Sequence, residues 1–171
     1  MIGLLELFEA HGITIWLDGG WAVDAAIGTQ TRPHKDVDVI LALSDVPKLQ
    51  LILGDRGFAV REGIVPHSFV LADSTGLEVD VHSVRFDERG DGIYRMQNGE
   101  NWIFTREALS GSGRIGGKAV RCLTPEAQVE CHAFGYTPVE KDFRDMEHLA
   151  ARFGVDVPET LRRPDQSHTA R

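Results

Sequence analysis

The chain has 171 residues, of which 42% are hydrophobic, and this is enough for one domain with a buried core. Its formal charge of −8 arises from 26 acidic and 18 basic residues, which argues against duplex nucleic acid as a partner. Cys122 and Cys131 are too few for a disulfide framework and are not spaced as a metal-binding pair. No leader segment and no apolar stretch of membrane-spanning length is found, so we expect a cytoplasmic protein that binds neither nucleic acid nor a membrane.

The first half of the chain alternates helical and extended patterns. Apolar residues at helical spacing or in strict alternation, with Gly12, Gly28 and Gly57 as stop signals, define the elements. In chain order we predict a helix over 1–11, a strand over 13–17, a break at Gly19-Gly20, a helix over 21–28, a strand over 36–43, a helix from the capping residues Ser44 and Asp45 to about 55, and strands over 58–62, 67–73 and 77–84.

The second half begins with a polar, Gly-rich segment over 87–117 that contains short strand-like pieces at 93–94 and 102–104. A short strand over 118–122 follows. Thr124-Pro125-Glu126 is a strong helix start, and this helix should run to about Phe134. A last helix is predicted over 138–153, ended by Gly154, and the polar tail after 158 should be loose. Together the elements indicate an α+β fold or a small mixed α/β sheet.

Two aspartates lie on one face of the strand predicted over 36–43. Side chains at alternate strand positions point the same way, so Asp36 and Asp38 share a face and the aliphatic residues between them share the other. A solvated acidic face is one interpretation. However, Ile40 and Ala42 continue this face with apolar side chains, and neighbouring like charges repel each other unless water or a cation intervenes. A pair of Mg²⁺ ions, which prefer carboxylate oxygens, would relieve the repulsion.

Gly19 and Gly20 stand between a strand and a helix. Glycines at such a position let the backbone approach a ligand closely, and the free N–H groups of the following helix form an anion site. A tight structural turn is the alternative interpretation. In combination with the Asp-Val-Asp strand, the two glycines bring a phosphate site and a metal site into one short unit.

The stretch LDGGWAVD…RPHKDVDV resembles the signature of the nucleotidyltransferase superfamily, Gly-Gly or Gly-Ser followed a short distance later by Asp-x-Asp. It is most similar to the small antibiotic nucleotidyltransferases, the lincosamide enzymes first and the aminoglycoside enzymes second. LEVDVHSV and RCLTPEAQVECHAFGY extend the resemblance over roughly residues 13–150. The resemblance implies a mixed β-sheet flanked by helices, with a catalytic core over 1–123, a C-terminal helical part over 124–157 and a loose tail over 158–171.

The resemblance also implies a reaction, in which a nucleoside monophosphate passes from ATP or another NTP to a hydroxyl of a small molecule and pyrophosphate leaves. It places a third carboxylate at Asp80, which shares a strand face with Glu78 and His82. Asp36, Asp38 and Asp80 would then hold two Mg²⁺ ions. Asp80 would bind the ion on the nucleophile side, accept the hydroxyl proton, or do both, and the sequence leaves these roles open.

Further candidates follow from position. The residues expected to meet the nucleotide are Gly19, Gly20, Arg32 and Lys35. The residues expected around the acceptor are His82, Tyr94, Glu100 and Trp102. The start of the last helix contains Lys141, Asp142 and Asp145. Acidic residues there suit the helix dipole, so we assign none of the three to the site.

The expected partners are an NTP and a small-molecule acceptor, with the chain a monomer or a homodimer. Three other functions remain open. A nucleotidyltransferase of the toxin–antitoxin type would modify a protein or an RNA, although the chain lacks a basic stripe for RNA. A non-catalytic binding module could keep the same fold, although the complete set of carboxylates argues against it. A Ca²⁺-binding domain would need an Asp-rich loop of suitable spacing, which the sequence does not contain.

Overall fold

The computed structural model describes residues 1–134 and 137–163. Its main sheet has seven strands: β1 (Ile15–Asp18), β2 (Asp36–Ala42), β3 (Ala59–Ile64), β4 (Ser68–Ala72), β5 (Glu78–Phe86), β6 (Gly92–Arg95) and β7 (Asn101–Phe104). The strand order is β1-β2-β5-β4-β3. Strand β6 pairs with the C-terminal end of β5 on one side and with β7 on the other. Strands β2 and β5 are parallel and the other pairs are antiparallel, so the sheet is mixed.

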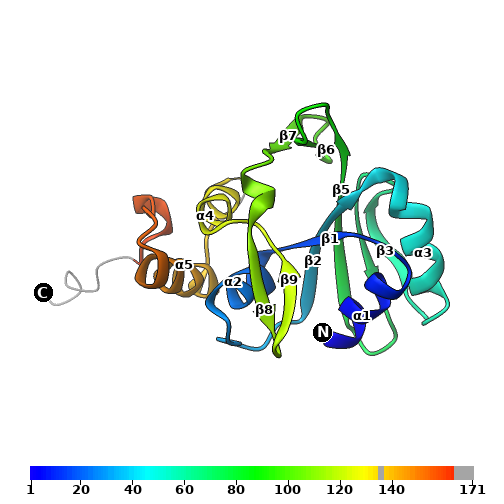
Figure 1. Cartoon of the computed structure of the whole chain (residues 1–171), viewed down its shortest axis with the longest axis horizontal. Coiled ribbons are helices and arrows are strands. Elements are labelled where there is room, and N and C mark those ends of the chain that lie inside the picture. The colour runs from blue at the N-terminus through cyan, green and yellow to red at the C-terminus, as the bar shows by residue number, and fades with distance from the viewer. Residues whose placement is uncertain (135–136, 164–171) are drawn as a thin grey trace, which may run out of the picture.

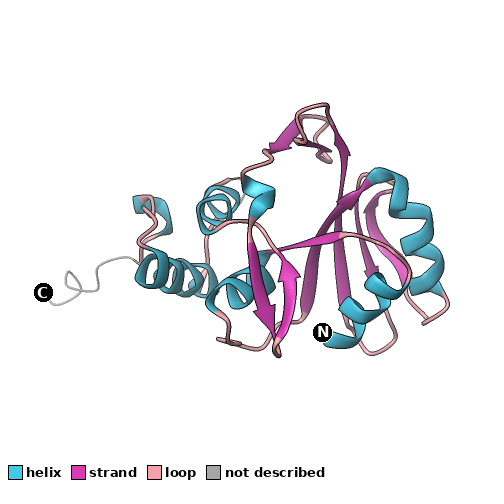
Figure 2. Cartoon of the chain, in the orientation of Figure 1, coloured by secondary structure: helices cyan, strands magenta, loops and turns pink. Residues whose placement is uncertain are grey.

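Five α-helices and a separate hairpin accompany this sheet: α1 (Ile2–Ala10), α2 (Gly19–Ile27), α3 (Val46–Gly54), α4 (Pro125–Ala133) and α5 (Glu140–Phe153), with the hairpin formed by β8 (Ser112–Ile115) and β9 (Lys118–Arg121). Helices α1 and α3 lie beside the sheet, whereas α2, α4 and α5 gather at the opposite end of the molecule (Figures 1 and 2). None of the helices in the described residues is both long and apolar enough to cross a membrane.

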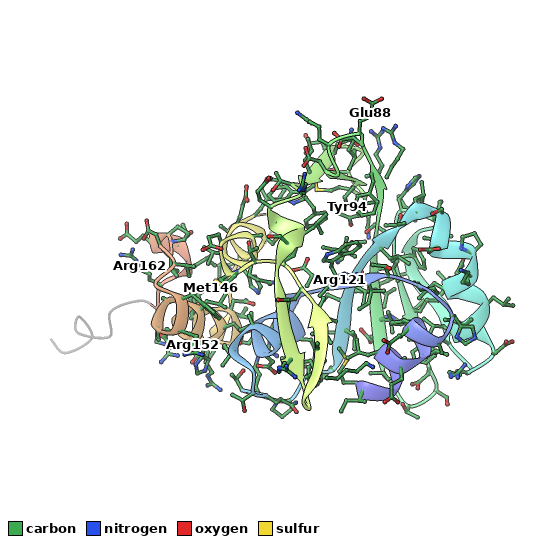
Figure 3. All side chains as sticks on the ribbon, viewed as in Figure 1. Glu88, Tyr94, Arg121, Met146, Arg152 and Arg162 are labelled. Carbon is green, nitrogen blue, oxygen red and sulfur yellow. The ribbon has the colours of Figure 1, made fainter. Side chains whose placement is uncertain are left out.

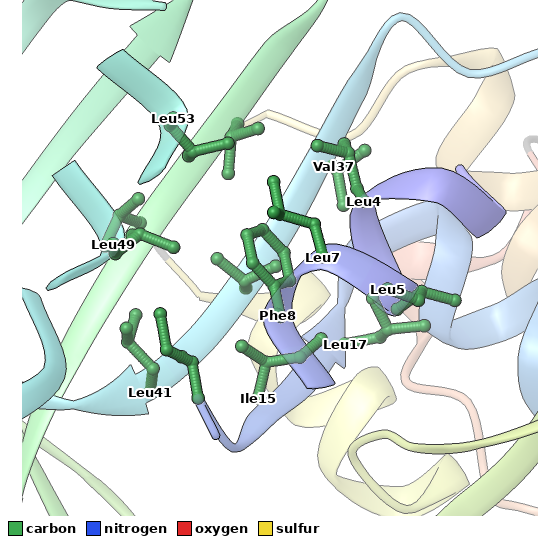
Figure 4. Packing of buried hydrophobic residues seen from close by; sticks show 14 of the residues in the cluster. Leu4, Leu5, Leu7, Phe8, Ile15, Leu17, Val37, Leu41, Leu49 and Leu53 are labelled. Carbon is green, nitrogen blue, oxygen red and sulfur yellow. The ribbon is translucent and has the colours of Figure 1, made fainter. Parts of the chain in front are cut away.

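The largest core lies on the aliphatic face of the central strands. Phe8 of α1 is almost fully buried and packs with Leu41 of β2 and with Leu49 and Leu53 of α3 (Figure 4). These side chains occupy alternate positions on the strand and helical spacings on α1 and α3, as an amphipathic pattern requires. This packing holds the other face of β2, which carries the aspartates, toward the opposite side of the sheet.

A second core joins the C-terminal helices to α2. Met146 of α5 is fully buried and packs with Val23 of α2 and Val129 of α4 (Figure 3). Leu161, in the short 3₁₀ segment Glu159–Leu161, closes this cluster. The α5 helix is therefore fixed against α2, immediately beside the end of β2.

The predicted α+β class and mixed, helix-flanked sheet are confirmed, but several details of the prediction are wrong. Helix α2 begins at Gly19 rather than after the glycine pair, because Asp18 caps it. Asp45 makes no capping hydrogen bond; Leu43–Asp45 forms a 3₁₀ turn instead. The segment 112–115, expected as irregular, is strand β8, in which Gly113 packs directly on the backbone of Ala25.

The expected tail also needs correction at its start, because Leu161 is buried and the chain is packed to that point. Residues 164–171 lie outside the described residues. The division into a core over 1–123 and a helical part over 124–157 stays a prediction.

Candidate active site

Three aspartates form a row across three neighbouring strands. The antiparallel pairing of β1 with β2 places Asp18 opposite Asp38, and the parallel pairing of β2 with β5 places Asp38 opposite Asp80. Neighbouring strands lie about 4.8 Å apart, so carboxylates in register must lie close together. Asp36 is one strand period from Asp38 and lies opposite Glu78. The strand order thus adds Asp18, which we did not predict, to the expected pair Asp38 and Asp80.

The row carries uncompensated negative charge. Burial raises the pKa of Asp38 well above its ordinary value, and the neighbouring aspartates raise it further. Burial also raises the pKa of Asp80, while His82 acts in the opposite direction. Asp18 accepts a hydrogen bond from the N–H of Gly19 at 2.6 Å. Within the described part of the chain, no hydrogen bond to Asp38 is found, so its carboxylate is available to a ligand.

Part of this group has the spacing of a candidate cation site. Ligand atoms of Asp38, Asp80 and His82 all lie within 4.8 Å of one another, and Asp80 Oδ1 is 3.9 Å from His82 Nε2. Carboxylate oxygens beside unrelieved like charge suit a hard divalent cation. The structure therefore brings together two of the three predicted ligands and adds His82, which we had placed in the acceptor pocket. Asp36 lies beside this group rather than in it.

A cavity of about 230 Å³ opens beside Asp18 and Asp38 of the row, and Asp80 is not among its lining residues. Its lining comes from the start of α2, from β2 and from the C-terminal helices: Asp18, Gly19, Gly20, Arg32, Asp36, Asp38, Cys131, His132, Lys141 and Asp142. Lys35 is exposed and does not line this cavity. A larger cavity of about 470 Å³ lies between α1 and β9, away from the aspartate row, and its carboxylate Glu9 is paired with Lys118 at 2.6 Å.

Both predicted glycines line the cavity, and each has a packing reason to be glycine. Gly19 has a positive φ of 58°, and a Cβ there would overlap the carboxylate of Asp38. A Cβ on Gly20 would overlap the side chains of Arg32 and His34. Close approach at Gly20 is therefore made by the protein's own side chains, and a bulky residue there would disturb the loop before β2 as well as any ligand.

Arg32 reaches the cavity but is engaged by the last helix. Its Nη2 and Nε lie 2.7 and 3.1 Å from the two carboxylate oxygens of Asp145, which is fully buried. The hydrogen bonds to this carboxylate raise the pKa of Arg32. Asp145 is thus a partner for Arg32, and our interpretation of it through the helix dipole alone is wrong. The pair fastens the loop that precedes β2 to α5.

A second anchor fixes the same loop to α2. His34 Nε2 lies 2.5 Å from Asp24 Oδ2, both side chains being 1% exposed, and the N–H and hydroxyl of Thr31 donate to Asp24 Oδ1 at 2.9 and 2.6 Å. Burial alone would disfavour ionised Asp24, but the bonds from His34 and Thr31 outweigh it and hold the pKa of Asp24 below its ordinary value. The His34 side chain is therefore a buried anchor that also packs on Trp21.

The residues expected around the acceptor separate into two groups. His82 and Tyr94 lie together beside Asp80, with His82 Nδ1 3.0 Å from the Tyr94 hydroxyl, and Trp102 lies opposite Tyr94 on β7. Glu100 is exposed in the turn between β6 and β7, where it accepts a hydrogen bond from Asn98. Glu100 does not line the cavity at the start of α2, whereas His82 adjoins the aspartate row.

Sequence reasoning missed several cavity residues. Asp18 directly precedes the glycine pair and alternates with Trp16, so its place on the aspartate face could have been read from the strand pattern. Lys141 and Asp142 line the cavity, although Asp142 also caps α5 by accepting from the Val139 N–H at 2.8 Å. Cys131 lines it too, but burial raises the pKa of this thiol far above its ordinary value, so it is not a nucleophile.

Comparisons with known proteins give a matching family and several similar sequences. The model of the aminoglycoside-2''-adenylyltransferase family matches residues 1–149. The chain is 30% identical over 146 residues to a lincosamide resistance protein of Staphylococcus haemolyticus, covering 85% of this chain and 89% of that protein. It is 28% identical over 124 residues to a 2''-aminoglycoside nucleotidyltransferase of Escherichia coli, covering 72% of this chain and 66% of that protein.

Solved structures include similar folds. The lincomycin-bound lincosamide antibiotic adenylyltransferase LnuA superposes with a TM-score of 0.78 and 28% identity, over 88% of this chain and 94% of that one. The aminoglycoside enzyme ANT(2")-Ia, in complex with adenylyl-2"-tobramycin, gives a TM-score of 0.65 at 23% identity, over 86% and 83% of the two chains. The second likeness shows a shared fold.

Proposed function

Since this chain belongs to the aminoglycoside-2''-adenylyltransferase family of antibiotic nucleotidyltransferases, we propose that it transfers AMP from ATP to a hydroxyl of a lincosamide antibiotic and releases pyrophosphate. The preference for a lincosamide over an aminoglycoside is supported by the relative that shares 30% identity over 89% of its length and by the lincomycin-bound structure with a TM-score of 0.78.

One observation carries the proposal: Asp38, which lines the cavity, lies in register with Asp80 on the neighbouring parallel strand, and burial and like charge raise the pKa of both. A purely structural strand would not retain this repulsion. The carboxylates of Asp36, Asp38 and Asp80 would hold two Mg²⁺ ions, with Asp18 at the edge of the site. When bound, such ions lower the pKa of an attacking hydroxyl and neutralise the leaving phosphates.

The nucleotide would lie at the start of α2. Backbone N–H groups at a helix N-terminus favour phosphate oxygens, and Gly19 and Gly20 at the start of α2 line the cavity. Lys141 adds a positive charge there and makes no ion pair within the described residues. Arg32, whose charge is shared with Asp145, would complete the phosphate contacts. Lys35, being exposed outside the cavity, is the weakest of the predicted contacts.

The acceptor hydroxyl would approach from the side of β5 and β6. Asp80 is 34% exposed, which leaves one carboxylate oxygen accessible to an incoming hydroxyl. A raised pKa brings Asp80 nearer to the pKa of a useful proton acceptor. Tyr94 and Trp102 would border the antibiotic on this side, with Trp102 packed against Phe134 at a ring-centroid distance of 4.8 Å.

The activity is tested by incubating the purified protein with Mg²⁺, each NTP in turn, and a panel of lincosamides and aminoglycosides. Pyrophosphate release and the mass of the modified antibiotic are measured. We expect adenylylated lincosamide with ATP. Product formed only with aminoglycosides would overturn the choice of acceptor. No product with any antibiotic would overturn the proposed reaction and favour a protein or RNA substrate, or a binding module.

The role of Asp80 is tested separately by measuring kcat against Mg²⁺ concentration for the wild type and Asp80→Asn, together with ATP affinity. A proton acceptor acts only during the reaction, so its loss lowers kcat while ATP affinity survives. A residue that is only a metal ligand would have its rate restored by high Mg²⁺. We expect a dominant loss of kcat with partial rescue; full rescue would refute the role as base.

A further inference from the structure

His82, unlike Tyr94 and Trp102, belongs to the group of residues that could hold a metal ion. It stands two positions after Asp80 on β5, so both side chains share the face that carries the aspartate row. Its side chain is 20% exposed, its Nε2 lies 3.9 Å from Asp80 Oδ1, and ligand atoms of Asp38, Asp80 and His82 all lie within 4.8 Å of one another. The imidazole and the two carboxylates are therefore close enough to share one ion.

The other edge of the His82 ring is held by a chain of hydrogen bonds. Tyr94 donates its hydroxyl proton to Ser68 Oγ at 2.7 Å, in a buried contact that joins β6 to β4. A phenol has a single proton, so its oxygen must accept from the imidazole Nδ1, which lies 3.0 Å away. The two rings meet edge to face at 87° with centroids 5.1 Å apart, which fixes the plane of the imidazole.

A neutral imidazole with its proton on Nδ1 has a lone pair on Nε2. In His82 this nitrogen lies 3.9 Å from Asp80 Oδ1, in the group that also contains Asp38. We propose that His82 Nε2 is a direct ligand of the divalent ion held by Asp38 and Asp80, and that Tyr94 is the positioning residue that keeps the ring in this tautomer. The inference rests on the proposed function in sharing its ion site.

A nitrogen donor has a consequence for the choice of metal. Carboxylate and water oxygens suit Mg²⁺ and Mn²⁺ alike, whereas imidazole favours the first-row transition metals. A site with two carboxylates and one imidazole should bind Mn²⁺ more tightly relative to Mg²⁺ than the same site without the imidazole. Mn²⁺ is also paramagnetic, so a bound nitrogen can be detected directly.

The test is pulsed electron paramagnetic resonance of the full-length protein loaded with Mn²⁺ alone, in natural-abundance form and with ¹⁵N-labelled histidine. We expect ¹⁴N modulation from a directly bound imidazole, replaced by ¹⁵N modulation in the labelled protein. An all-oxygen spectrum of the wild type would overturn the proposal, and this result does not depend on the folding of any variant.

Variants identify the histidine. His82→Gln should abolish the nitrogen modulation, whereas His132→Gln should keep it, because His132 lines the cavity beside Asp38 but does not belong to the group formed by Asp38, Asp80 and His82. Loss in His132→Gln alone would overturn the assignment. Tyr94→Phe should weaken Mn²⁺ binding in calorimetry about tenfold, the usual effect of removing a hydrogen-bond partner of a metal-bound histidine.

This test separates the inference from the proposed function. Nitrogen modulation without turnover of any antibiotic would contradict the proposed reaction and leave the ligand assignment standing. Full adenylylation of a lincosamide by a protein whose Mn²⁺ spectrum lacks nitrogen modulation would contradict the ligand assignment alone.

Discussion

Two groups of acidic side chains near the start of β2 differ in whether they have a close partner of opposite charge. Asp24 and Asp145, both buried, each have a close partner: His34 at 2.5 Å and Arg32 at 2.7 Å. Asp38 faces other carboxylates instead. The pKa of Asp24 is accordingly held below its ordinary value, while burial and like charge raise that of Asp38.

The paired carboxylates stabilise the fold, whereas the carboxylate of Asp38 is suited to binding a cation. A buried carboxylate without a partner costs free energy, so folded proteins rarely keep one without a function. The paired group, Asp24 and Asp145 with their partners, fixes the loop before β2. Asp18 and Asp38 of the aspartate row then line the cavity to which this loop contributes Arg32 and α5 contributes Lys141.

The largest effect should follow the removal of a charge from the aspartate row. We expect Asp38→Asn to lower kcat/KM for adenylylation by about 10³-fold or more, because a metal-bound carboxylate stabilises charge at the reacting phosphate. Steady-state kinetics measure this, with circular dichroism to confirm the fold. Glu88→Gln, in the exposed turn between β5 and β6 (Figure 3), is the matched control and should keep full activity. More than a few per cent residual activity in Asp38→Asn would contradict the assignment.

The next effect concerns the paired group. Asp145→Asn leaves the guanidinium of Arg32 without its buried carboxylate, and breaking such a pair costs about 3 kcal/mol of unfolding free energy. Urea denaturation measures the loss. Glu147→Gln on the same helix removes an exposed pair with Arg163 at 3.4 Å and should change stability by less than about 0.5 kcal/mol. Equal losses in the two variants would show that the buried pair has no special weight.

A smaller effect tests the positive side of the cavity. Lys141→Met should weaken ATP binding about tenfold, equivalent to about 1.4 kcal/mol, with a smaller difference at high salt. Isothermal titration calorimetry with Mg-ATP gives the affinity. Arg144 lies three residues further along α5 and is exposed, with its Nη2 3.8 Å from Glu140 Oε1. Arg144→Met therefore serves as the control. A similar loss in both variants would indicate a general charge effect rather than a contact.

The smallest effect is a gain. Without metal, Asp38→Asn should raise Tm at pH 7 by about 2–4 °C, the change expected for about 1 kcal/mol in a chain of this size. Folding raises the pKa of Asp38, so the folded state binds this proton more tightly than the unfolded chain does. The repulsion therefore lowers stability above the unfolded-state pKa of about 4 and disappears below it. Calorimetric scans should show the advantage vanishing near pH 4; a variant less stable than the wild type at pH 7 would contradict this.

The parts of the fold that sequence could predict are those governed by local periodicity. The alternation in β2 and β5 places Asp36, Asp38 and Asp80 on the correct faces because strand side chains alternate strictly. Thr124 caps α4 as expected, accepting from the Ala127 N–H at 3.3 Å. Strand β8 was not predicted because its sequence has little β-propensity. Glycine is required at position 113 because a Cβ there would overlap the backbone of Ala25.

The parts of the site that sequence could not predict depend on which strands and helices become neighbours. Asp18 joins the row only because β1 lies next to β2, and Lys141 reaches the cavity only because α5 packs on α2. Gly20 looked like a ligand contact, whereas its lack of a Cβ accommodates Arg32 and His34. In each of these cases the partner belongs to another element, so a local pattern can give the face on which a side chain lies, as for Asp18, but not its neighbour.

The pair between Arg32 and Asp145 joins residues 113 positions apart, which has a consequence for how the protein is made. Synthesis proceeds from the N-terminus, and domains begin to fold in that order. Asp18, Asp38 and Asp80 have all left the ribosome long before α5 does. A nascent chain therefore contains all three aspartates of the row while Arg32 is still without a partner, and the emergence of α5 is the event that completes the lining of the cavity.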